Sequence, residues 1–354
     1  MTILVALIGL IFLIVIHELG HMLTAKALGV RVDEFGIGFG PALFKKKFGK
    51  TVYSFRIILL GGFAKMAGME DIGSVKQQEG ELPPDTYPAK PPWKRALIIF
   101  AGPAVNIVAC MLILAGTFLI SGGAVATTEV DKVEPGTFAA ESGVKSGDQI
   151  ISVNNTSTDD WEKFQNTVSA KKPGEDVTLV VERNGQEKTF SGQLSENPRD
   201  PGSGLVGVQP VAEKTTYGPL QSLGMGVERT ATLTVAYIGG LYQLITGELA
   251  FFENVSGPVG IVGVSSDSVS QGTFPLFLAV ISLILGIMNL LPILPLDGGH
   301  LLFIAAEKVI GRPVSAQTMG KIAFLGLALM LTLFLFATYA DVSKIITGQP
   351  FIPE

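Results

Sequence analysis

The sequence predicts a polytopic α-helical membrane protein with four transmembrane helices, a membrane-associated β-hairpin or sheet and one extracytoplasmic α+β domain. Three observations predict this class. The 354 residues are 47% hydrophobic and only 16% charged, a composition typical of a chain with several membrane spans. Long apolar runs lie near both ends of the chain and around residue 110. Between them, residues 122 to 210 contain short alternating segments of the kind that form strands in a soluble domain.

Charge and cysteine content exclude several classes of protein. The formal net charge of -5 gives no indication of nucleic-acid binding. Cys110 is the only cysteine, so no intramolecular disulfide can stabilise the chain. The first apolar run has no positive charge before it and carries ionisable residues where a cleavage region would begin, so we expect a retained helix rather than a signal peptide.

The first predicted span, residues 1 to 28, contains the motif HExxH. His17 and His21 stand four residues apart and share one face of a helix, where they can hold one Zn2+ while Glu18 beside them activates water. The alternative is a surface helix that happens to carry two histidines. The apolar run before the motif argues against this alternative, because ionisable groups at membrane depth cost roughly 2.5 kcal/mol or more each and are rarely without a function.

Residues 29 to 92 contain no span and are predicted to lie on the cytoplasmic side. The β-branched and aromatic residues from 51 to 66, with the pair Gly61 and Gly62, predict strands and a hairpin. This sheet could simply cap the membrane part, or its edge could pair with an extended substrate, because a helical peptide bond cannot be attacked until it unwinds. Residues 73 to 92 are rich in Pro, Gln and Glu and predict a mobile loop.

The second predicted span covers residues 93 to 121 and begins with a Trp-Lys-Arg run that can anchor it at the membrane interface. Gly102 and Ala104 would allow another helix to approach closely. Asn106 places a polar group in lipid, where it either packs helices together or supports the site formed by the histidines.

Residues 211 to 273 are predicted to form an amphipathic surface helix and a connector. Basic residues concentrate between the first two spans, so the positive-inside rule places the amino terminus and the soluble domain outside and the histidines toward the inner half of the bilayer. The LDG sequence at the end of the next span can meet the histidines only if residues 215 to 250 do not cross. Glu228, Arg229 and Glu248 also fit a surface helix better than a buried span.

The third and fourth spans are predicted at residues 274 to 307 and 318 to 340, followed by a short tail at 341 to 354. From Asn289 to His300 the third span contains NLLPILPLDGGH. Its two prolines remove backbone hydrogen bonds, which a membrane tolerates only where protein or a cavity satisfies the freed carbonyls. The pattern therefore predicts a broken helix that faces a polar site.

A catalytic zinc normally has three protein ligands. His300 is the only histidine outside the HExxH motif, so the third ligand is either His300 or a carboxylate. Asp297 is the deeper candidate and is favoured, which leaves His300 as a residue at the membrane interface. Asn289 lies about two turns earlier on roughly the same face. It could bind the substrate backbone or an oxyanion, or only pack helices.

The soluble domain contains a specific pattern. Residues 130 to 157 show a run of Pro, small residues and a short helix followed by GDxIxxVN, and this run resembles a PDZ domain. The resemblance implies a PDZ-like domain over residues 122 to 210 whose groove takes chain ends or extended peptides. Such a groove would serve as a substrate filter or as a docking module.

Taken together, HELGH, GPAVN, the PDZ-like insert and NxxPxxxLDG resemble the site-2 protease family of intramembrane zinc metalloproteases, specifically the bacterial regulator of sigma-E protease group. The resemblance covers nearly the whole chain. It implies His17, His21 and Asp297 as zinc ligands, Glu18 as the catalytic acid and base, and Asn289 in substrate handling. It also implies a membrane-embedded sheet around the strands at 51 to 66.

The same resemblance implies a multi-pass protein of the bacterial cytoplasmic (inner) membrane. Members usually perform the second cleavage of single-span membrane proteins, such as anti-sigma factors, or clear signal-peptide remnants. Two departures from the family pattern stand out. Only one PDZ-like domain fits between the second and third spans, where some members have two. The second proline stands directly before Leu296, one place later than the family pattern.

The leading hypothesis is thus an intramembrane zinc endopeptidase that acts on single-span proteins in the lipid bilayer. The alternative is a non-catalytic membrane protein whose PDZ-like domain binds peptides or chain ends. The complete set of two histidines, a glutamate and an aspartate favours the enzyme. A zinc transporter would need more acids or histidines along a path than these spans supply.

Overall fold

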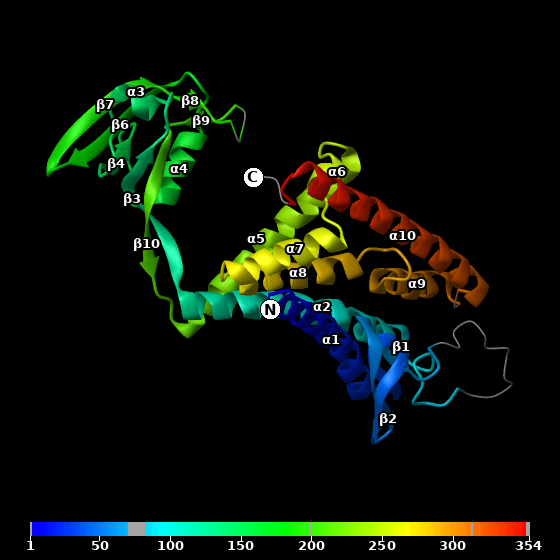
Figure 1. Cartoon of the computed structure of the whole chain (residues 1–354). Coiled ribbons are helices and arrows are strands. Elements are labelled where there is room, and N and C mark those ends of the chain that lie inside the picture. The colour runs from blue at the N-terminus through cyan, green and yellow to red at the C-terminus, as the bar shows by residue number, and fades with distance from the viewer. Residues whose placement is uncertain (1, 70–81, 199, 201, 313, 352–354) are drawn as a thin grey trace. The chain divides into compact units, whose positions relative to one another are not determined.

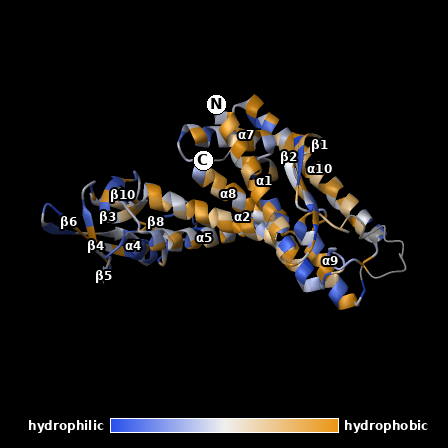
Figure 2. Ribbon diagram, turned by 90° about the horizontal axis from the view of Figure 1, so that it is seen from below, coloured by the Kyte–Doolittle hydropathy of each residue, from blue (hydrophilic) through white to orange (hydrophobic). Residues whose placement is uncertain are grey.

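The structure, a computed structural model, describes residues 2–69, 82–198, 200, 202–312 and 314–351. The chain divides into two compact units (Figure 1). The helical unit combines Met1–Phe118 with Gly218–Glu354, and the inserted unit is Leu119–Tyr217. Figure 2 shows hydrophobic residues along most of α1 and α8, and hydrophilic residues gathered on the strands of the inserted unit.

The helical unit contains the predicted membrane spans. In chain order its helices are α1 (Thr2–Ala27), α2 (Pro92–Ser121), α5 (Pro219–Thr246), α6 (Phe251–Asn254), α7 (Pro258–Ser270), α8 (Phe274–Asn289), α9 (Asp297–Ile310) and α10 (Ala316–Thr347). Among the described residues, three helices are long and apolar enough to cross a membrane, namely α1, α2 and most of α10. A fourth crossing stays a prediction, because α8 has only 16 residues.

The third predicted span is interrupted where the prolines stand. Helix α8 ends at Asn289 and α9 begins at Asp297, so the segment between them is not helical. A Cβ on Gly298 would overlap the backbone of Leu290, and one on Gly299 would lie 2.5 Å from the backbone nitrogen of Leu294. Glycine at both positions therefore lets the irregular segment fold back onto the first turn of α9.

Helix α10 continues to Thr347, past the residue at which the last span is predicted to end, residue 340. The reason is an internal ion-dipole contact. Asp341 is 0% exposed, and its carboxylate accepts hydrogen bonds from the backbone nitrogens of Gly257 and Gly260 at 2.9 and 2.7 Å. These amides belong to the start of α7, where a negative charge is favourable. The contact holds the last turns of α10 in helical form.

Helix α5 occupies the region predicted as a surface helix, and it is not among the helices of span length and composition in the described chain. One side of it packs on α2. A Cβ on Gly226 would lie 2.6 Å from the Met111 carbonyl, and Thr230 Oγ1 lies 3.7 Å from Cys110 Sγ. The location of α5 at the outer membrane surface stays a prediction.

The strands between the first two helices are longer than predicted. Strand β1 (Val32–Phe48) and strand β2 (Thr51–Met66) pair antiparallel. The hairpin turn lies at Gly49, whose φ of 60° is in the left-handed region, and not at Gly61 and Gly62 as predicted. The missed partner strand contains Gly, Pro and a lysine run, which are weak strand signals.

Both long strands bend, so each contributes two pairing segments. Residues 32–37 of β1 pair with 62–66 of β2 on one side and with 52–55 on the other, and 44–48 pair with 51–55. The sheet order is therefore 62–66, 32–37, 51–55, 44–48. The bend in β2 occurs at Gly61, where the ring of Phe39 occupies the space that a Cβ would need.

This sheet, α1, α2 and α9 share one hydrophobic core. Its buried members include Met22, Val32, Phe35, Ile98 and Ile304. The close approach of α1 to α2 depends on small residues. A Cβ on Gly20 would lie only 2.6 Å from the Ala101 carbonyl.

The inserted unit is an α+β structure with its own core. Its strands are β3 (Gly123–Val133), β4 (Gln149–Val153), β5 (Thr156–Ser157), β6 (Asp176–Arg183), β7 (Gln186–Gln193), β8 (Ser195–Glu196), β9 (Gly204–Leu205) and β10 (Val208–Thr215). Its helices are α3 (Phe138–Ser142) and α4 (Trp161–Ser169). The main sheet has the order β10-β3-β4-β6-β7, with β5 beside β4. Pairing of Thr215 with Gly123 extends the unit past its predicted end at residue 210.

The aspartate of the GDxIxxVN pattern has a structural role in this unit. Asp148 is 0% exposed, and its carboxylate accepts hydrogen bonds from Arg183 Nε at 2.5 Å and from the Lys145 backbone nitrogen at 2.8 Å. Burial alone would raise the pKa of Asp148, but these bonds outweigh it and hold the pKa below its usual value.

Candidate metal centre

Three of the predicted site residues converge inside the helical unit. The Asp297 Oδ2 atom lies 3.2 Å from His17 Nε2 and 3.3 Å from His21 Nε2. The two histidine Nε2 atoms are 3.3 Å apart. Among the described residues, these three form the one group of His, Cys, Asp and Glu that could hold a metal ion. Residues almost 280 positions apart in sequence thus meet at a single point.

The spacing of these atoms fits zinc. Ligand atoms about 2.0 to 2.2 Å from a tetrahedral zinc lie about 3.3 to 3.6 Å from one another, close to the three observed distances. The protonation pattern agrees. His21 Nδ1 lies 2.8 Å from the Ile98 carbonyl oxygen, which can only accept, so Nδ1 carries the proton and neutral His21 presents a lone pair at Nε2. A cation held among these buried lone pairs would satisfy all three of them.

Each ligand is positioned by packing of its helix. His17 and His21 are buried on one face of α1. Asp297 is the first residue of α9, because the irregular segment before it ends at Leu296, which has extended backbone angles and caps the helix. Gly102 of α2 lies directly on the His21 imidazole, and a Cβ there would overlap Nε2. A glycine at this place lets α2 pack against the metal-binding face.

Glu18 lies between the histidines and the sheet. The backbone N–H of Ala64 in β2 lies close to its carboxylate. A Cβ on Gly62 would lie 3.0 Å from Glu18 Cγ. The sheet therefore touches the glutamate at two points and limits its movement, while the side chain stays partly exposed.

Asn106 lies on α2 one turn after Gly102. It is 0% exposed, and neither atom of its side-chain amide has a hydrogen-bond partner among the described residues. Its backbone carbonyl accepts from Ser282 Oγ of α8 at 2.8 Å. Buried amides without a partner are costly and rare. The Asn106 side chain therefore has free hydrogen-bonding capacity on the same helix that covers His21.

Asn289 and His300 do not belong to the group of His17, His21 and Asp297. Asn289 ends α8 and donates from Nδ2 to the Leu285 carbonyl of the same helix at 3.0 Å. His300, one turn after Asp297, lines a cavity of about 250 Å3. Arg95 and Glu307 also line this cavity and pair there at 2.6 Å. Of the two candidates for the third ligand, the structure brings only Asp297 to the histidines.

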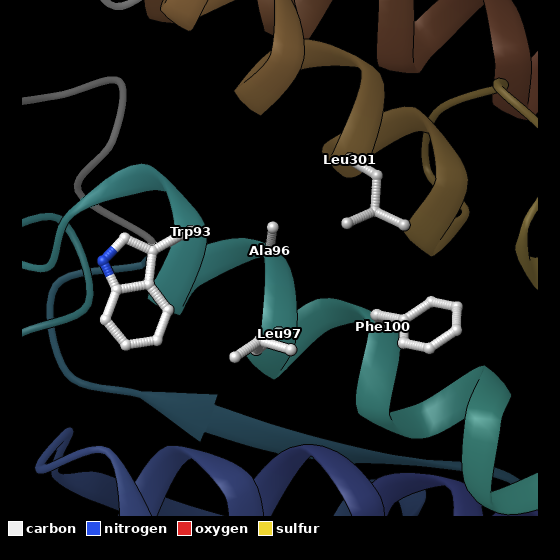
Figure 3. Close-up of a pocket in the computed structure, with 5 residues that line it drawn as sticks. All are labelled: Trp93, Ala96, Leu97, Phe100 and Leu301. Carbon is white, nitrogen blue, oxygen red and sulfur yellow. The ribbon is translucent and has the colours of Figure 1, made fainter.

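A second hollow lies between α2 and α9. Four residues of α2 and one of α9 line this space of about 510 Å3, as Figure 3 shows: Trp93, Ala96, Leu97, Phe100 and Leu301. The lining is apolar apart from the indole N–H of Trp93, so the hollow suits hydrocarbon and not a metal or a charged ligand.

Comparison with known proteins agrees with this arrangement. The family model described as peptidase family M50 matches residues 5–333. The chain belongs to peptidase family M50. Among the relatives, zinc metalloprotease RasP of Geobacillus kaustophilus is 31% identical over 94% of this chain and 95% of its own length. RasP of Shouchella clausii is 32% identical over 94% and 96%, and the putative zinc metalloprotease Cj1068 of Campylobacter jejuni is 32% identical over 95% and 91%.

These relatives confirm the predicted family, the regulator of sigma-E protease type and the enzyme class. The chain is a zinc metalloprotease with Zn2+ as its cofactor, and M50 membership is contrary to the alternative of a non-catalytic peptide-binding protein. Among solved structures, the PDZ domain of an SdrC-like protein from Listeria monocytogenes aligns with 24% of the chain at 19% identity and a TM-score of 0.22. That similarity is too low to support an inference.

Sequence reasoning missed the groups that hold the site together. The Ile98 carbonyl and the Ala64 amide are backbone groups, and residue types carry no signal for them. Gly62 left a signal, since a glycine inside a strand pattern often marks a close approach by another group. We predicted a turn there, but the approaching group is Glu18.

Proposed function

We propose that this M50 protease hydrolyses a peptide bond within or near the transmembrane segment of single-span membrane proteins. His17, His21 and Asp297 would hold the zinc ion. The observation that carries the proposal is the convergence of their three ligand atoms, 3.2 to 3.3 Å apart, between apolar helices. A polar site among membrane-spanning helices suits a substrate that is itself in the membrane better than a soluble one.

The metal site and Glu18 would have different roles in the reaction. Zn2+ held there supplies a Lewis acid for the scissile carbonyl and lowers the pKa of water. Glu18 takes the proton from the attacking water and passes it to the leaving nitrogen, as a general base and then a general acid. Contact with the sheet at Gly62 supports this role, because it limits the positions that the Glu18 side chain can take.

The sheet offers a way to bind the substrate in an extended form. In the sheet order, the segment 62–66 is an outer segment that pairs with residues 32–37 of β1. Glu18 lies against this segment at Gly62 and Ala64. A substrate strand added to that edge would pass beside the glutamate with its peptide bonds unwound. Asn289 and Asn106 would support the substrate or the oxyanion with their side-chain amides.

The substrate class follows from the orientation that we propose. The histidines lie in the second half of α1, and the lysine-rich loop follows that helix, which supports an active site toward the cytoplasmic side and a PDZ-like unit outside. Substrates would be anti-sigma factors already shortened by a first cleavage and signal-peptide remnants. The PDZ-like unit would bind new chain ends or exclude large outer domains.

Replacement of the two candidate third ligands tests the metal site. We expect Asp297→Ala to lose zinc during purification in detergent and His300→Ala to keep it, as measured by metal analysis. Wild-type protein should cut single-span substrates with short outer tails inside the membrane segment. Unchanged zinc in Asp297→Ala would assign the third ligand elsewhere, and cleavage restricted to soluble substrates would contradict the substrate class.

A further inference from the structure

The outermost segment of the sheet has an unusual surface. Residues 44–50, here called the lysine edge, end β1 and form the hairpin turn. All of them are exposed. Phe44 is 61% exposed and Phe48 is 76% exposed. The four lysines, which are Lys45, Lys46, Lys47 and Lys50, form no ion pair with any described residue.

The register divides the lysine edge into two faces. Phe44 pairs with Phe55, and Phe48 pairs with Thr51. Side chains alternate along a strand, so Phe44, Lys46 and Phe48 project on one face and Lys45 and Lys47 on the other. Aromatic rings thus gather on one face, together with Phe55, which is 40% exposed.

Nearby acids do not neutralise these lysines. Glu34, an acid on the neighbouring part of β1, accepts hydrogen bonds from Ser54 Oγ and Arg56 Nη2, each at 2.7 Å. Burial alone would raise the pKa of Glu34, but these bonds outweigh it and lower the pKa. Arg56 forms the ion pair with this carboxylate, and Lys45 attracts it only at longer range, so the four lysines of the lysine edge keep an excess of positive charge.

The sheet also lies at the right height for a membrane surface. Lys26, in the last turn of α1, donates from Nζ to Tyr53 Oη at 3.1 Å. Tyr53 pairs with Lys46 of the lysine edge. The sheet is thus in contact with the end of α1, a helix long and apolar enough to span a bilayer. The end of such a helix lies where the lipid headgroups begin.

We propose that the lysine edge binds the headgroups of anionic phospholipids in the adjoining leaflet. Phe44 and Phe48 enter the acyl region, and Lys45, Lys47 and Lys50 extend to the phosphates. Exposed aromatic side chains among lysines are the combination that an anionic interface retains. Long lysine side chains, including Lys46 between the two phenylalanines, can extend from the acyl region to the phosphates. A purely solvated charge run would not carry two phenylalanines with most of their surface exposed. This lipid site is independent of the proposed proteolytic function.

Full-length protein in lipid nanodiscs tests the proposal without an activity assay. Cys110 is 0% exposed, and Cys110→Ala with Phe48→Cys allows a nitroxide label at position 48 alone. Electron paramagnetic resonance then gives the ratio of lipid-embedded to water-exposed label. We expect a high ratio in discs that contain phosphatidylglycerol and a low ratio in discs of phosphatidylcholine alone. The ratio in the phosphatidylglycerol discs should fall when the salt concentration is raised.

Charge variants identify the residues responsible. Each lysine near an anionic leaflet changes binding about fivefold, so Lys45→Gln, Lys47→Gln and Lys50→Gln together should lower the ratio about 100-fold. A matched control removes three exposed lysines of the inserted unit, Lys132→Gln, Lys188→Gln and Lys214→Gln, and should leave it unchanged. Equal ratios in the two kinds of disc, or an equal loss in the control, would overturn the lipid site.

Discussion

The contact between Gly102 and His21 gives the sharpest test of the metal centre. A Cβ at position 102 would overlap the Nε2 atom of His21, which is the atom that would bind zinc. Gly102→Ala must therefore push the ring away or force α2 from α1. Ligand distances in metal sites are held within about 0.2 Å, so either movement spoils the site. Loss of an outer support already costs about 10- to 100-fold in metal affinity, and direct displacement should cost at least as much, about 1.4 to 2.7 kcal/mol.

Competition with chelators of graded strength measures this affinity in the purified protein. The control is Gly116→Ala on the same helix, where a Cβ meets nothing within 4 Å. Both variants gain the same helix propensity, about 0.5 to 1 kcal/mol, so only the contact with His21 differs. Zinc affinity of Gly102→Ala within twofold of the control would refute the geometry described for α1 and α2.

The remaining predictions concern the sheet and the inserted unit. Gly62→Val should press on Glu18 and lower kcat about 10- to 100-fold with zinc content unchanged, since Glu18 is not a ligand; a loss of zinc instead would contradict this. Asp148→Asn should destabilise the inserted unit by about 3 kcal/mol at neutral pH, measured by hydrogen exchange in the full chain. Because the folded pKa of Asp148 is lowered, its stabilisation is present above about pH 4 and is lost as pH falls through the folded value. The wild type should therefore lose protection from hydrogen exchange on acidification. Protection in Asp148→Asn, which is already lower at neutral pH, should change little over the same pH range.

Much of the site was predictable because its chemistry depends on side chains with fixed spacing. His17 and His21 share a helix face by their separation of four residues, and burial in an apolar run made a chance motif improbable. Asp297 needed a topological argument as well, since it meets the histidines only through the path of the chain. The structure places its Oδ2 atom 3.2 Å from His17.

The parts that could not be predicted depend on long-range packing. The partner strand of residues 51–66 carries glycines and lysines, and its pairing is set by the bend at Gly61 and by α1, not by local propensity. The end of α10 depends on Asp341, whose partners are backbone amides of α7 more than 80 residues away. The hydrophobic pattern alone ended that helix too early.

The most direct test of the account is the pair of wild type and Glu18→Gln, purified in detergent and compared for zinc content and for cleavage of single-span substrates. Glutamine keeps the shape of the side chain, but it cannot take up a proton. We predict near-stoichiometric zinc in both proteins and cleavage by the wild type alone. Cleavage by Glu18→Gln at the wild-type rate would contradict the assignment of Glu18 and with it the proposed mechanism.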